Sequence, residues 1–209
     1  YRKNKMNRKF ISLSDISSSF VYFPLHLQPE MTTDVLGGEY ANQAVTILKL
    51  REVIPNEVLI LIKENPKQTG LFRSQLFYDV IFQSKNIYWV ADDTPTFDLI
   101  KKATCVATIT GTVGWEALRL EKPVICFGSV FYNHLPGVFR VDADFQWESV
   151  LRFKYDKILL TSAVKKMSKF LSPGVSDLVY KSIVKDFDYC KNALEVSDSI
   201  LKYIEDFKK

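Results

Sequence analysis

The chain has 209 residues, of which 47% are hydrophobic and 25% are charged, and its formal net charge is +4. This composition is ordinary for a soluble globular protein that buries a sizeable core, and so small a net charge gives no argument for a nucleic-acid partner. No apolar run approaches the roughly 20 residues that a membrane-spanning helix needs. The start of the chain shows no signal-peptide pattern.

The cysteines indicate the cellular compartment of the protein, and the first residues bear on whether the sequence is a fragment of a longer chain. Cys105, Cys126 and Cys190 are unevenly spaced, and two of them lie in apolar runs, which is typical of buried thiols in a reducing compartment rather than of disulfides or zinc ligands. We therefore expect a cytoplasmic protein. Five basic residues crowd the first nine positions; a solvated arm is the simpler interpretation, and peripheral contact with the anionic inner membrane or an acidic partner is the alternative. The chain starts at Tyr1 rather than Met, so an upstream partner domain could be missing.

The first part of the chain predicts a linker, a strand and a long loop. Residues 1–19 are first basic and then rich in Ser, as in a lead-in or linker. Residues 20–23 form a β-prone run that Pro24 stops. The polar loop at 25–40 is rich in Pro, Thr and Gly, and such a long loop after a buried strand is more often functional than idle.

From residue 41 onward, helical and strand patterns alternate. Helices are predicted at 41–54, 72–82, 97–103 and 113–120, with Thr96 as the N-cap of the third. Strands are predicted at 58–62, 87–90, 105–109 and 124–127. Together with the first strand, this order predicts an α/β fold, a Rossmann-like parallel sheet with helices on both faces.

After Gly128 the pattern changes to a loop and a helical tail. The loop is predicted at 131–139, and helices are predicted at 147–153, 156–171, 175–187 and 189–207. We therefore expect three parts: a lead-in or linker at 1–19, a Rossmann-like domain at 20–140, and a helical extension at 141–209 that packs on the domain.

The turn Thr110-Gly-Thr-Val-Gly114 predicts a ligand site at the carboxyl end of a strand, where open α/β sheets bind ligands. Gly111 permits a tight turn and close approach, and the hydroxyls of Thr110 and Thr112 with the amides of the following helix suit a nucleotide phosphate. One turn further on, the carboxylate of Glu116 can accept hydrogen bonds from sugar hydroxyls. The alternative is a plain capped turn with a solvated glutamate, because a lone GTxG is a weak motif.

Two other loops that follow strands carry ionisable groups. His26 can act as a general base or phosphate ligand, and Glu30 as an acid, a base or a hydroxyl anchor. Lys63 can neutralise phosphate, and Glu64 can transfer a proton or bind a hydroxyl. A structural histidine and solvated charges are the alternatives, and His134 is more simply structural. The sequence has no GxGxxG followed by an acidic residue, no Walker loop, no nucleophile elbow and no paired metal-binding histidines.

Three segments together resemble the capsule polysaccharide biosynthesis proteins of bacteria. Residues 20–33 (FVYFPLHLQPEMTT) are similar to a family segment YFPLHxQPExTT, and residues 61–66 (LIKENP) to a strand ending in KEHP. Residues 108–118, with the later Lys-Pro-Val and Phe-Gly, are similar to the signature TxTGTxGxEAL…GKPV…FG. The segments keep their order and spacing over roughly residues 20–140, and jointly they are far more specific than any one alone.

The resemblance implies a Kdo-transferase-like enzyme of the GT-B type, in which two Rossmann-like domains face each other across a cleft. This chain would be the C-terminal, nucleotide-sugar-binding half, and relatives include transferases for 3-deoxy-manno-octulosonic acid (Kdo) that use CMP-Kdo. The implied catalytic residues are His26, Glu30 and Glu64. The implied substrate-binding residues are Gln28, Lys63, Asn65, Pro66, Thr110, Gly111, Thr112, Gly114 and Glu116.

One position departs from the family pattern. Asn65 replaces the histidine of the family's His-Pro, and an amide can donate a hydrogen bond to phosphate but cannot be cationic or shuttle a proton. Either the donor differs, or His26 and Lys63 carry the positive role, or activity has been lost.

The predicted function is that of a glycosyltransferase of bacterial surface polysaccharide synthesis with a CMP-linked acidic sugar as donor. Its expected partners are the nucleotide sugar, a glycan or glycolipid acceptor, and a missing N-terminal acceptor domain, with no cofactor, no obligate metal and no nucleic acid. The alternatives are a UDP-sugar transferase or 2-epimerase on the same scaffold, and a non-catalytic module that binds nucleotide sugar or serves as a scaffold.

Overall fold

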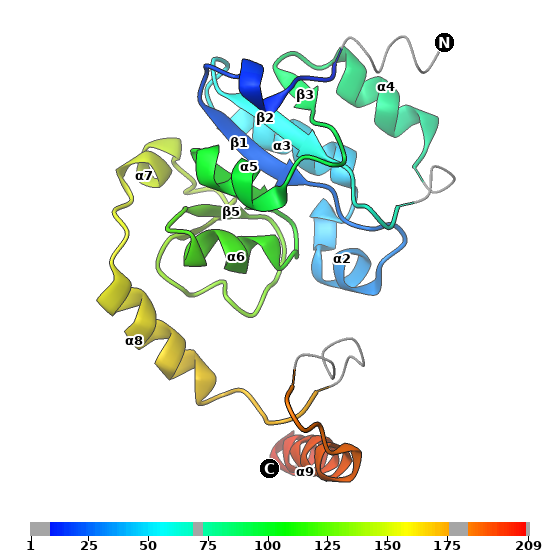
Figure 1. The fold of residues 1–209 in the computed structure, drawn as a ribbon, viewed down its shortest axis with the longest axis vertical. Coiled ribbons are helices and arrows are strands. Elements are labelled where there is room, and N and C mark those ends of the chain that lie inside the picture. Colours follow the sequence, from blue (N-terminus) through cyan, green and yellow to red (C-terminus); the bar gives the residue numbers. More distant parts are fainter. Residues whose placement is uncertain (1–8, 69–72, 176–183, 208–209) are drawn as a thin grey trace. The chain divides into compact units, whose positions relative to one another are not determined.

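A computed structural model describes residues 9–68, 73–175 and 184–207 of the chain. It consists of two compact units, Tyr1–Lys157 and Ile158–Lys209. The first unit is built on a six-stranded parallel sheet with the strand order β3-β2-β1-β4-β5-β6 (Figure 1). Its strands are β1 (Phe20–Pro24), β2 (Leu59–Lys63), β3 (Ile87–Trp89), β4 (Cys105–Thr108), β5 (Val124–Cys126) and β6 (Val138–Arg140). This order is that of the Rossmann fold, so the predicted α/β class is confirmed.

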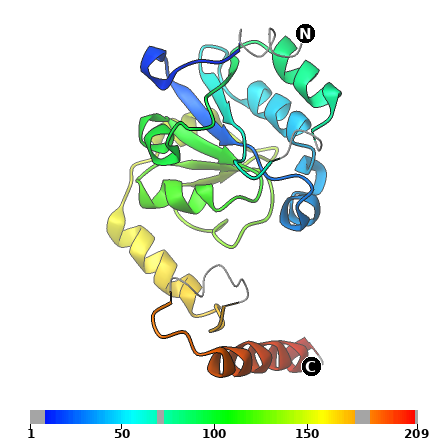
Figure 2. The same ribbon diagram turned by 45° about the vertical axis from the view of Figure 1, so that its right-hand side comes forward.

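Helices cover both faces of the sheet, as predicted. On one face lie α3 (Gln43–Val53) and α4 (Gln75–Gln83), and on the other α5 (Thr96–Lys102) and α6 (Val113–Arg119) lie side by side (Figures 1 and 2). Helix α3 starts where the side chain of Asn42 accepts hydrogen bonds from two early backbone N–H groups. Helix α4 starts where the Ser74 hydroxyl accepts one such bond, from the N–H of Phe77.

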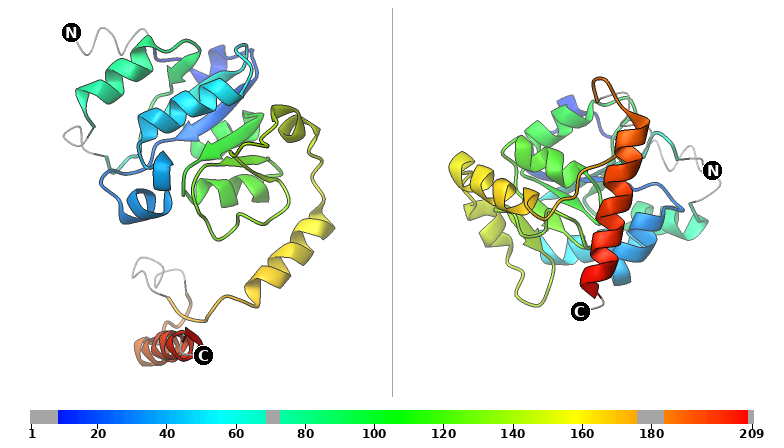
Figure 3. Two further views of the ribbon diagram at one scale, coloured as in Figure 1. Left: turned by 180° about the vertical axis from the view of Figure 1, so that it is seen from behind. Right: turned by 90° about the horizontal axis from the view of Figure 1, so that it is seen from below.

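The core explains why the central strands are almost purely apolar. Strands β1, β2, β4 and β5 are buried on both faces, which is what a parallel sheet between two helical layers requires. Helix α3 lies along one face of the sheet (Figure 3), and its Ile47 and Leu50 are fully buried. Leu99 and Ile100 of α5 are fully buried as well. Each such side chain stabilises the fold by about 1.5–3 kcal/mol. The short helix α7 (Trp147–Arg152) adds two more core side chains, Trp147 and Val150.

Three local predictions were wrong. The predicted loop at 131–139 runs into strand β6, which extends the sheet beyond β5. The predicted loop at 25–40 contains the helix α2 (Met31–Leu36) and a 3-10 turn, η2 (Gly38–Tyr40). In the predicted linker, Phe10 forms a parallel bridge with Trp89, and the backbone on either side of Phe10 forms two hydrogen bonds with Trp89. This segment therefore covers the edge of β3, where unpaired backbone groups would otherwise remain; a 3-10 turn, η1 (Leu13–Asp15), follows it.

The predicted N-cap of α5 was also wrong. Pro95 occupies the N-cap position, Thr96 is the first helical residue, and no side chain caps the helix. The Thr96 hydroxyl instead accepts a hydrogen bond from Nζ of Lys63, at 3.3 Å. The Thr96 hydroxyl therefore bonds the buried Lys63 instead of a backbone N–H of the helix.

The second unit contains the helices α8 (Lys157–Ser168) and α9 (Tyr189–Phe207), both close to their predicted bounds. Most of the predicted helix at 175–187 lies outside the described residues, and its described ends, residue 175 and residues 184–187, are not helical. The packing of the tail on the sheet stays a prediction. Among helices of the described residues, none combines the length and apolar character needed to cross a membrane.

Candidate functional site

A cleft of about 320 Å³ lies beyond the carboxyl ends of β1 and β4. These two strands are neighbours at the point where the strand order reverses, and crevices at such switch points are the usual ligand sites of open α/β sheets. The volume is at the lower end of the usual range, about 300–1,000 Å³, for small-molecule sites. The cleft is lined by Pro24, Leu25, His26, Glu30, Thr32, Asn65, Thr110, Gly111, Thr112 and Val113.

Three loops far apart in the sequence therefore meet at one cavity. Of the predicted site residues, the cleft brings together His26, Glu30, Asn65, Thr110, Gly111 and Thr112. The other predicted residues do not line it: Gln28, Lys63, Glu64, Pro66, Gly114 and Glu116. The contacts of these residues give the reason in most cases.

His26 is held rigidly in its neutral form. The backbone N–H of Ile109 donates to its Nε2 at 3.2 Å, so the ring proton is on Nδ1, and Thr108 Oγ1 lies 3.2 Å from the same nitrogen. Burial, together with the positive charge of Arg73, lowers the pKa of His26 to about 4. Burial and the neighbouring Arg73 therefore oppose a positive charge on His26, and its role at the site stays a prediction. Within the described residues Nδ1 forms no hydrogen bond, which leaves its N–H as a donor at the cleft.

Arg73, which the sequence analysis missed, connects the loops after β1 and β2. Its guanidinium donates to both carboxylate oxygens of Glu64, at 2.6 and 2.7 Å. It also donates to the backbone carbonyl of His26 at 2.7 Å and to the side-chain oxygen of Gln28 at 3.1 Å. The group lies over the ring of Phe77, with 5.1 Å between Cζ and the ring centroid. A lone arginine in a loop carries no sequence signal for this role.

These contacts explain why Glu64 and Gln28 do not line the cleft. The Glu64 carboxylate accepts hydrogen bonds from Arg73 and from the backbone N–H of Asn65. These bonds hold the loop after β2 in place on the side that does not face the cleft. Gln28 is tied to Arg73 and, through its backbone, to the side-chain amide of Gln68.

Lys63 is buried and turned toward the loop that precedes α5. Its Nζ donates to the backbone carbonyl of Thr94 at 2.6 Å and to the hydroxyl of Thr96 at 3.3 Å. The expected role of Lys63 in neutralising a phosphate would require these two bonds to break.

Glu30 and Thr110 are joined through a buried hydroxyl. Thr33 donates to Glu30 Oε2 at 3.1 Å, and its oxygen lies 3.2 Å from that of Thr110. This chain of polar atoms fixes the start of α2 against the loop after β4. The Glu30 carboxylate remains half-exposed at the cleft.

The turn after β4 is shaped by protein contacts as much as by a ligand. A Cβ on Gly111 would lie 2.8 Å from Thr108 Oγ1 and 3.0 Å from Cε1 of His26. Gly114 faces away from the cleft, because the Tyr132 ring lies against it and the Tyr132 hydroxyl donates to the carbonyl of Gly111. Both glycines are therefore explained by close packing inside the protein.

Donors that lack partners remain at the cleft. The side chain of Asn65 accepts a hydrogen bond from the N–H of Lys67 through its oxygen, and its NH₂ group has no acceptor within the described residues. The backbone N–H groups of Thr112 and Val113 likewise have no acceptor in the part of the chain that the structure describes. The Thr112 hydroxyl is exposed.

Two further predicted groups lie elsewhere. Burial raises the pKa of Glu116, whose side chain does not line the cleft. His134 is exposed in the loop before β6. No cluster of three or more potential metal ligands occurs among residues 9–68, 73–175 and 184–207.

The strand order defines a Rossmann-like α/β domain, and a polar cleft lies at its switch point. A family model described as capsule polysaccharide biosynthesis protein matches residues 7–157. Because this match spans more than half of the chain, the protein belongs to that family.

Individual relatives match only in part. Protein FixF of Sinorhizobium fredii is 29% identical over 135 residues, which cover 62% of this chain and 31% of FixF. The solved structure of KpsC from Thermosulfurimonas dismutans, a β-Kdo 2,7-transferase, has a TM-score of 0.50 and 20% identity over 61% of this chain and 39% of that chain. A β-Kdo 2,4-transferase KpsC from the same organism has a TM-score of 0.47 and 18% identity over 70% and 45% of the two chains. The chain thus spans less than half the length of these relatives, and the likeness to the 2,7-transferase shows a shared fold.

Proposed function

We propose that the chain is the donor-binding part of a glycosyltransferase of bacterial surface polysaccharide synthesis, with the nucleotide-activated sugar in the switch-point cleft. The observation that carries the proposal is the meeting of the three family-like segments at this one cavity. The whole enzyme is of the GT-B type, and a second Rossmann-like domain supplies the acceptor side. It works in the cytoplasm, where its substrates are made, and reaches its acceptor at the inner membrane.

The donor phosphate lies against Asn65 and the turn after β4. The donors there are neutral: the Asn65 NH₂ group, the backbone amides of Thr112 and Val113, the Thr112 hydroxyl and the Nδ1–H of His26. The side-chain cations nearby, Lys63 and Arg73, are already bonded to protein acceptors. Neutral donors are better matched to the single phosphate charge of a CMP-sugar than to the charges of a UDP-sugar. We therefore favour a CMP-linked acidic sugar such as Kdo.

Glu30 is the proposed general base or acceptor-hydroxyl anchor. Its carboxylate is half-exposed at the cleft and is oriented by Thr33. Preorganised donors stabilise the leaving phosphate, so the transfer needs no cofactor and no obligate metal. Nucleotide binding and transfer that are unchanged in excess EDTA are the expected result, and loss of transfer that Mg²⁺ restores would contradict it.

Calorimetric titration of the full-length protein with CMP and with UDP tests the proposal. The expected result is binding of CMP, weaker binding of UDP, and a matching order of thermal shifts. Stronger binding of UDP would favour the UDP-sugar transferase or 2-epimerase. Failure of both nucleotides to bind would overturn the proposal.

The interaction of Glu64 with Arg73 and the amide at position 65 favour a second candidate, a non-catalytic module that binds nucleotide sugar for an assembly. Glu30→Gln in the full-length protein separates the two. An enzyme should keep CMP affinity and lose transfer, whereas a module should sustain polysaccharide synthesis unchanged. The matched control is Asp34→Asn, because Asp34 is exposed on α2 and does not line the cleft.

A further inference from the structure

A second and larger cleft lies beside the first, beyond β5 and β6. Its volume is about 540 Å³. It is lined by Leu36, Gly37, Gly38, Glu39, Tyr40, Lys49, Phe127, Gly128, Ser129, Arg140, Val141, Asp142 and Ala143. None of these residues belongs to the switch-point cleft.

Helix α2 separates the two cavities. Its first half is bonded to the loop after β4 through the hydroxyls of Thr33 and Thr110. At its other end, the carbonyl of Leu36 accepts a hydrogen bond from the N–H of Ser129 at 2.9 Å. Both clefts therefore lie at the carboxyl edge of the sheet, on either side of one short helix.

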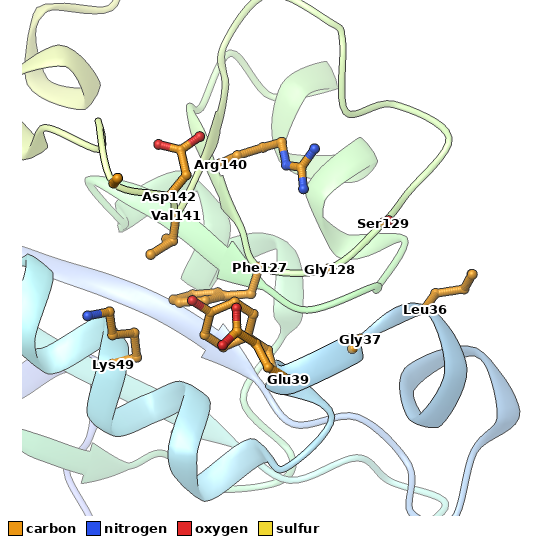
Figure 4. Close-up of a pocket in the computed structure, with 13 residues that line it drawn as sticks. Leu36, Gly37, Glu39, Lys49, Phe127, Gly128, Ser129, Arg140, Val141 and Asp142 are labelled. Atoms are coloured by element: carbon orange, nitrogen blue, oxygen red, sulfur yellow. The ribbon is translucent and has the colours of Figure 1, made fainter.

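Charges of both signs surround the second cleft. Glu39 and Lys49 lie on one side, and Arg140 and Asp142 on the other, with Phe127 between them (Figure 4). In the described parts of the chain, neither the carboxylate of Glu39 nor the guanidinium of Arg140 forms a hydrogen bond or ion pair. The only ion pair of Lys49 there is an exposed one with Glu52, at 3.2 Å, which is worth little.

The floor of this cleft is aromatic. Phe127 is nearly buried, and the half-buried ring of Tyr40 packs edge-on against it, with 5.1 Å between the ring centroids. The rest of the lining is mostly polar, so the two rings form a limited apolar face within a polar cleft.

The pairing of donors and acceptors selects the ligand class. Carboxylates only accept hydrogen bonds, whereas ammonium and guanidinium groups only donate them. An anion such as phosphate would be repelled by Glu39 and Asp142, and an amine by Lys49 and Arg140. A hydroxyl both donates and accepts, so a neutral compound with several hydroxyls can satisfy all four groups and lay its C–H face on the aromatic floor.

We propose that this cleft is a binding site for a neutral saccharide. Its role as a subsite for the growing glycan rests on the function proposed above, whereas saccharide binding itself does not. The chain would then hold the activated sugar on one side of α2 and uncharged residues of the glycan on the other.

NMR spectra of the full chain, labelled with ¹⁵N, test the proposal. The probes are methyl β-galactoside, methyl α-mannoside, lactose and cellobiose, with inorganic phosphate and CMP as the charged comparison. At least one neutral saccharide should shift the amide signals of Gly37, Gly38, Gly128 and Ser129 with millimolar affinity. Phosphate should leave these signals unchanged, and CMP should shift the amides of Thr110 to Val113 instead.

Variants that remove charges from the cleft test whether its charged side chains bind the saccharide. Glu39→Gln combined with Arg140→Gln should weaken saccharide binding about tenfold, because two charge-assisted hydrogen bonds are lost. The matched control is Glu57→Gln combined with Arg152→Gln, because the alternative Glu52 pairs with Lys49 of the cleft. Glu57 and Arg152 are exposed and lie outside the cleft, so the control should bind as the parent does.

Three results would overturn the proposal. The first is the absence of amide shifts with all four saccharides at their highest soluble concentrations. The second is a shift of these amides by phosphate alone, which would mark an anion site. The third is an equal loss of binding in the control variant. Saccharide binding without binding of CMP or UDP would support this proposal and contradict the proposed donor site. Binding of CMP or UDP without saccharide binding would support the donor site and contradict this proposal.

Discussion

Arg73 and Glu64 form a two-point ion pair, from Nε to Oε2 at 2.6 Å and from Nη2 to Oε1 at 2.7 Å. The Arg73 side chain is completely buried, while that of Glu64 retains 17% of its exposure. The remaining bonds of the guanidinium go to the loop after β1, at His26 and Gln28. The shape of the switch-point cleft therefore depends on a residue that does not line it.

Removing Arg73 should destabilise the protein strongly. Arg73→Ala removes the cation that pairs with the Glu64 carboxylate and the donor of two loop oxygens, and breaking a buried pair costs about 3–5 kcal/mol. The measurement is the free energy of unfolding in urea. Lys49→Ala is the control, because its ion pair with Glu52 is exposed and should contribute less than about 1 kcal/mol. An equal loss of unfolding free energy in the two variants would show that the buried ion pair stabilises the protein no more than the exposed one.

Stability should fall on acidification because of His26. Its pKa drops from 6.5 to about 4 on folding, so below pH 6.5 the unfolded chain binds a proton that the folded protein does not. The stabilisation is complete above pH 6.5 and is lost as the pH falls to about 4, by about 3 kcal/mol in total.

The difference between variants isolates this contribution from that of the carboxylates. The unfolding free energy of His26→Gln, measured between pH 7 and pH 4, should depend less on pH than that of the parent. His134→Gln, which changes an exposed histidine, should keep the parent's slope. Identical slopes in all three proteins would mean that His26 titrates normally.

Gly114→Ala should strain the packing of Tyr132. A Cβ at this position would overlap the Tyr132 hydroxyl and come within 2.8 Å of Cζ, and overpacking of this kind costs about 1–3 kcal/mol. Thermal unfolding of a double-mutant cycle with Tyr132→Phe provides the check. The cost of Gly114→Ala should be smaller in the Tyr132→Phe background, because one of the overlapping atoms is gone. Additive costs would contradict the contact.

The sheet could be predicted because its signals are local. The aliphatic runs of β1, β2 and β4 are separated by helical patterns, and that order alone predicts a parallel sheet. Strand β6 was missed because its three residues are only partly buried, and the six-residue helix α2 was hidden in a segment of Pro, Thr and Gly.

The site could be predicted only to the level of loops. Sequence places Lys63, Glu64 and Asn65 together after one strand, but the partner of each side chain comes from elsewhere in the chain. Lys63 bonds Thr94, Glu64 bonds Arg73, and only Asn65 lines the cleft. Such pairings depend on three-dimensional packing, which periodicity and composition do not encode.

Asn65→Asp should separate the two functions of that side chain. The carboxylate can still accept the hydrogen bond from the N–H of Lys67, at 3.0 Å in the parent, so the turn is preserved. The NH₂ donor is lost and a negative charge enters the cleft. A hydrogen bond to a charged group is worth about 1.5–3 kcal/mol, so CMP affinity should fall by about tenfold or more.

Two comparisons make this result specific. Asn56→Asp adds the same charge at an exposed position outside the cleft and should leave CMP affinity unchanged. Asn65→His restores the family's residue and should bind CMP at least as well as the parent, more so below the pKa of the new imidazole, because a cationic donor then faces the phosphate. If calorimetry showed the same CMP affinity for Asn65→Asp as for the parent, the proposed contact between Asn65 and the phosphate would be wrong.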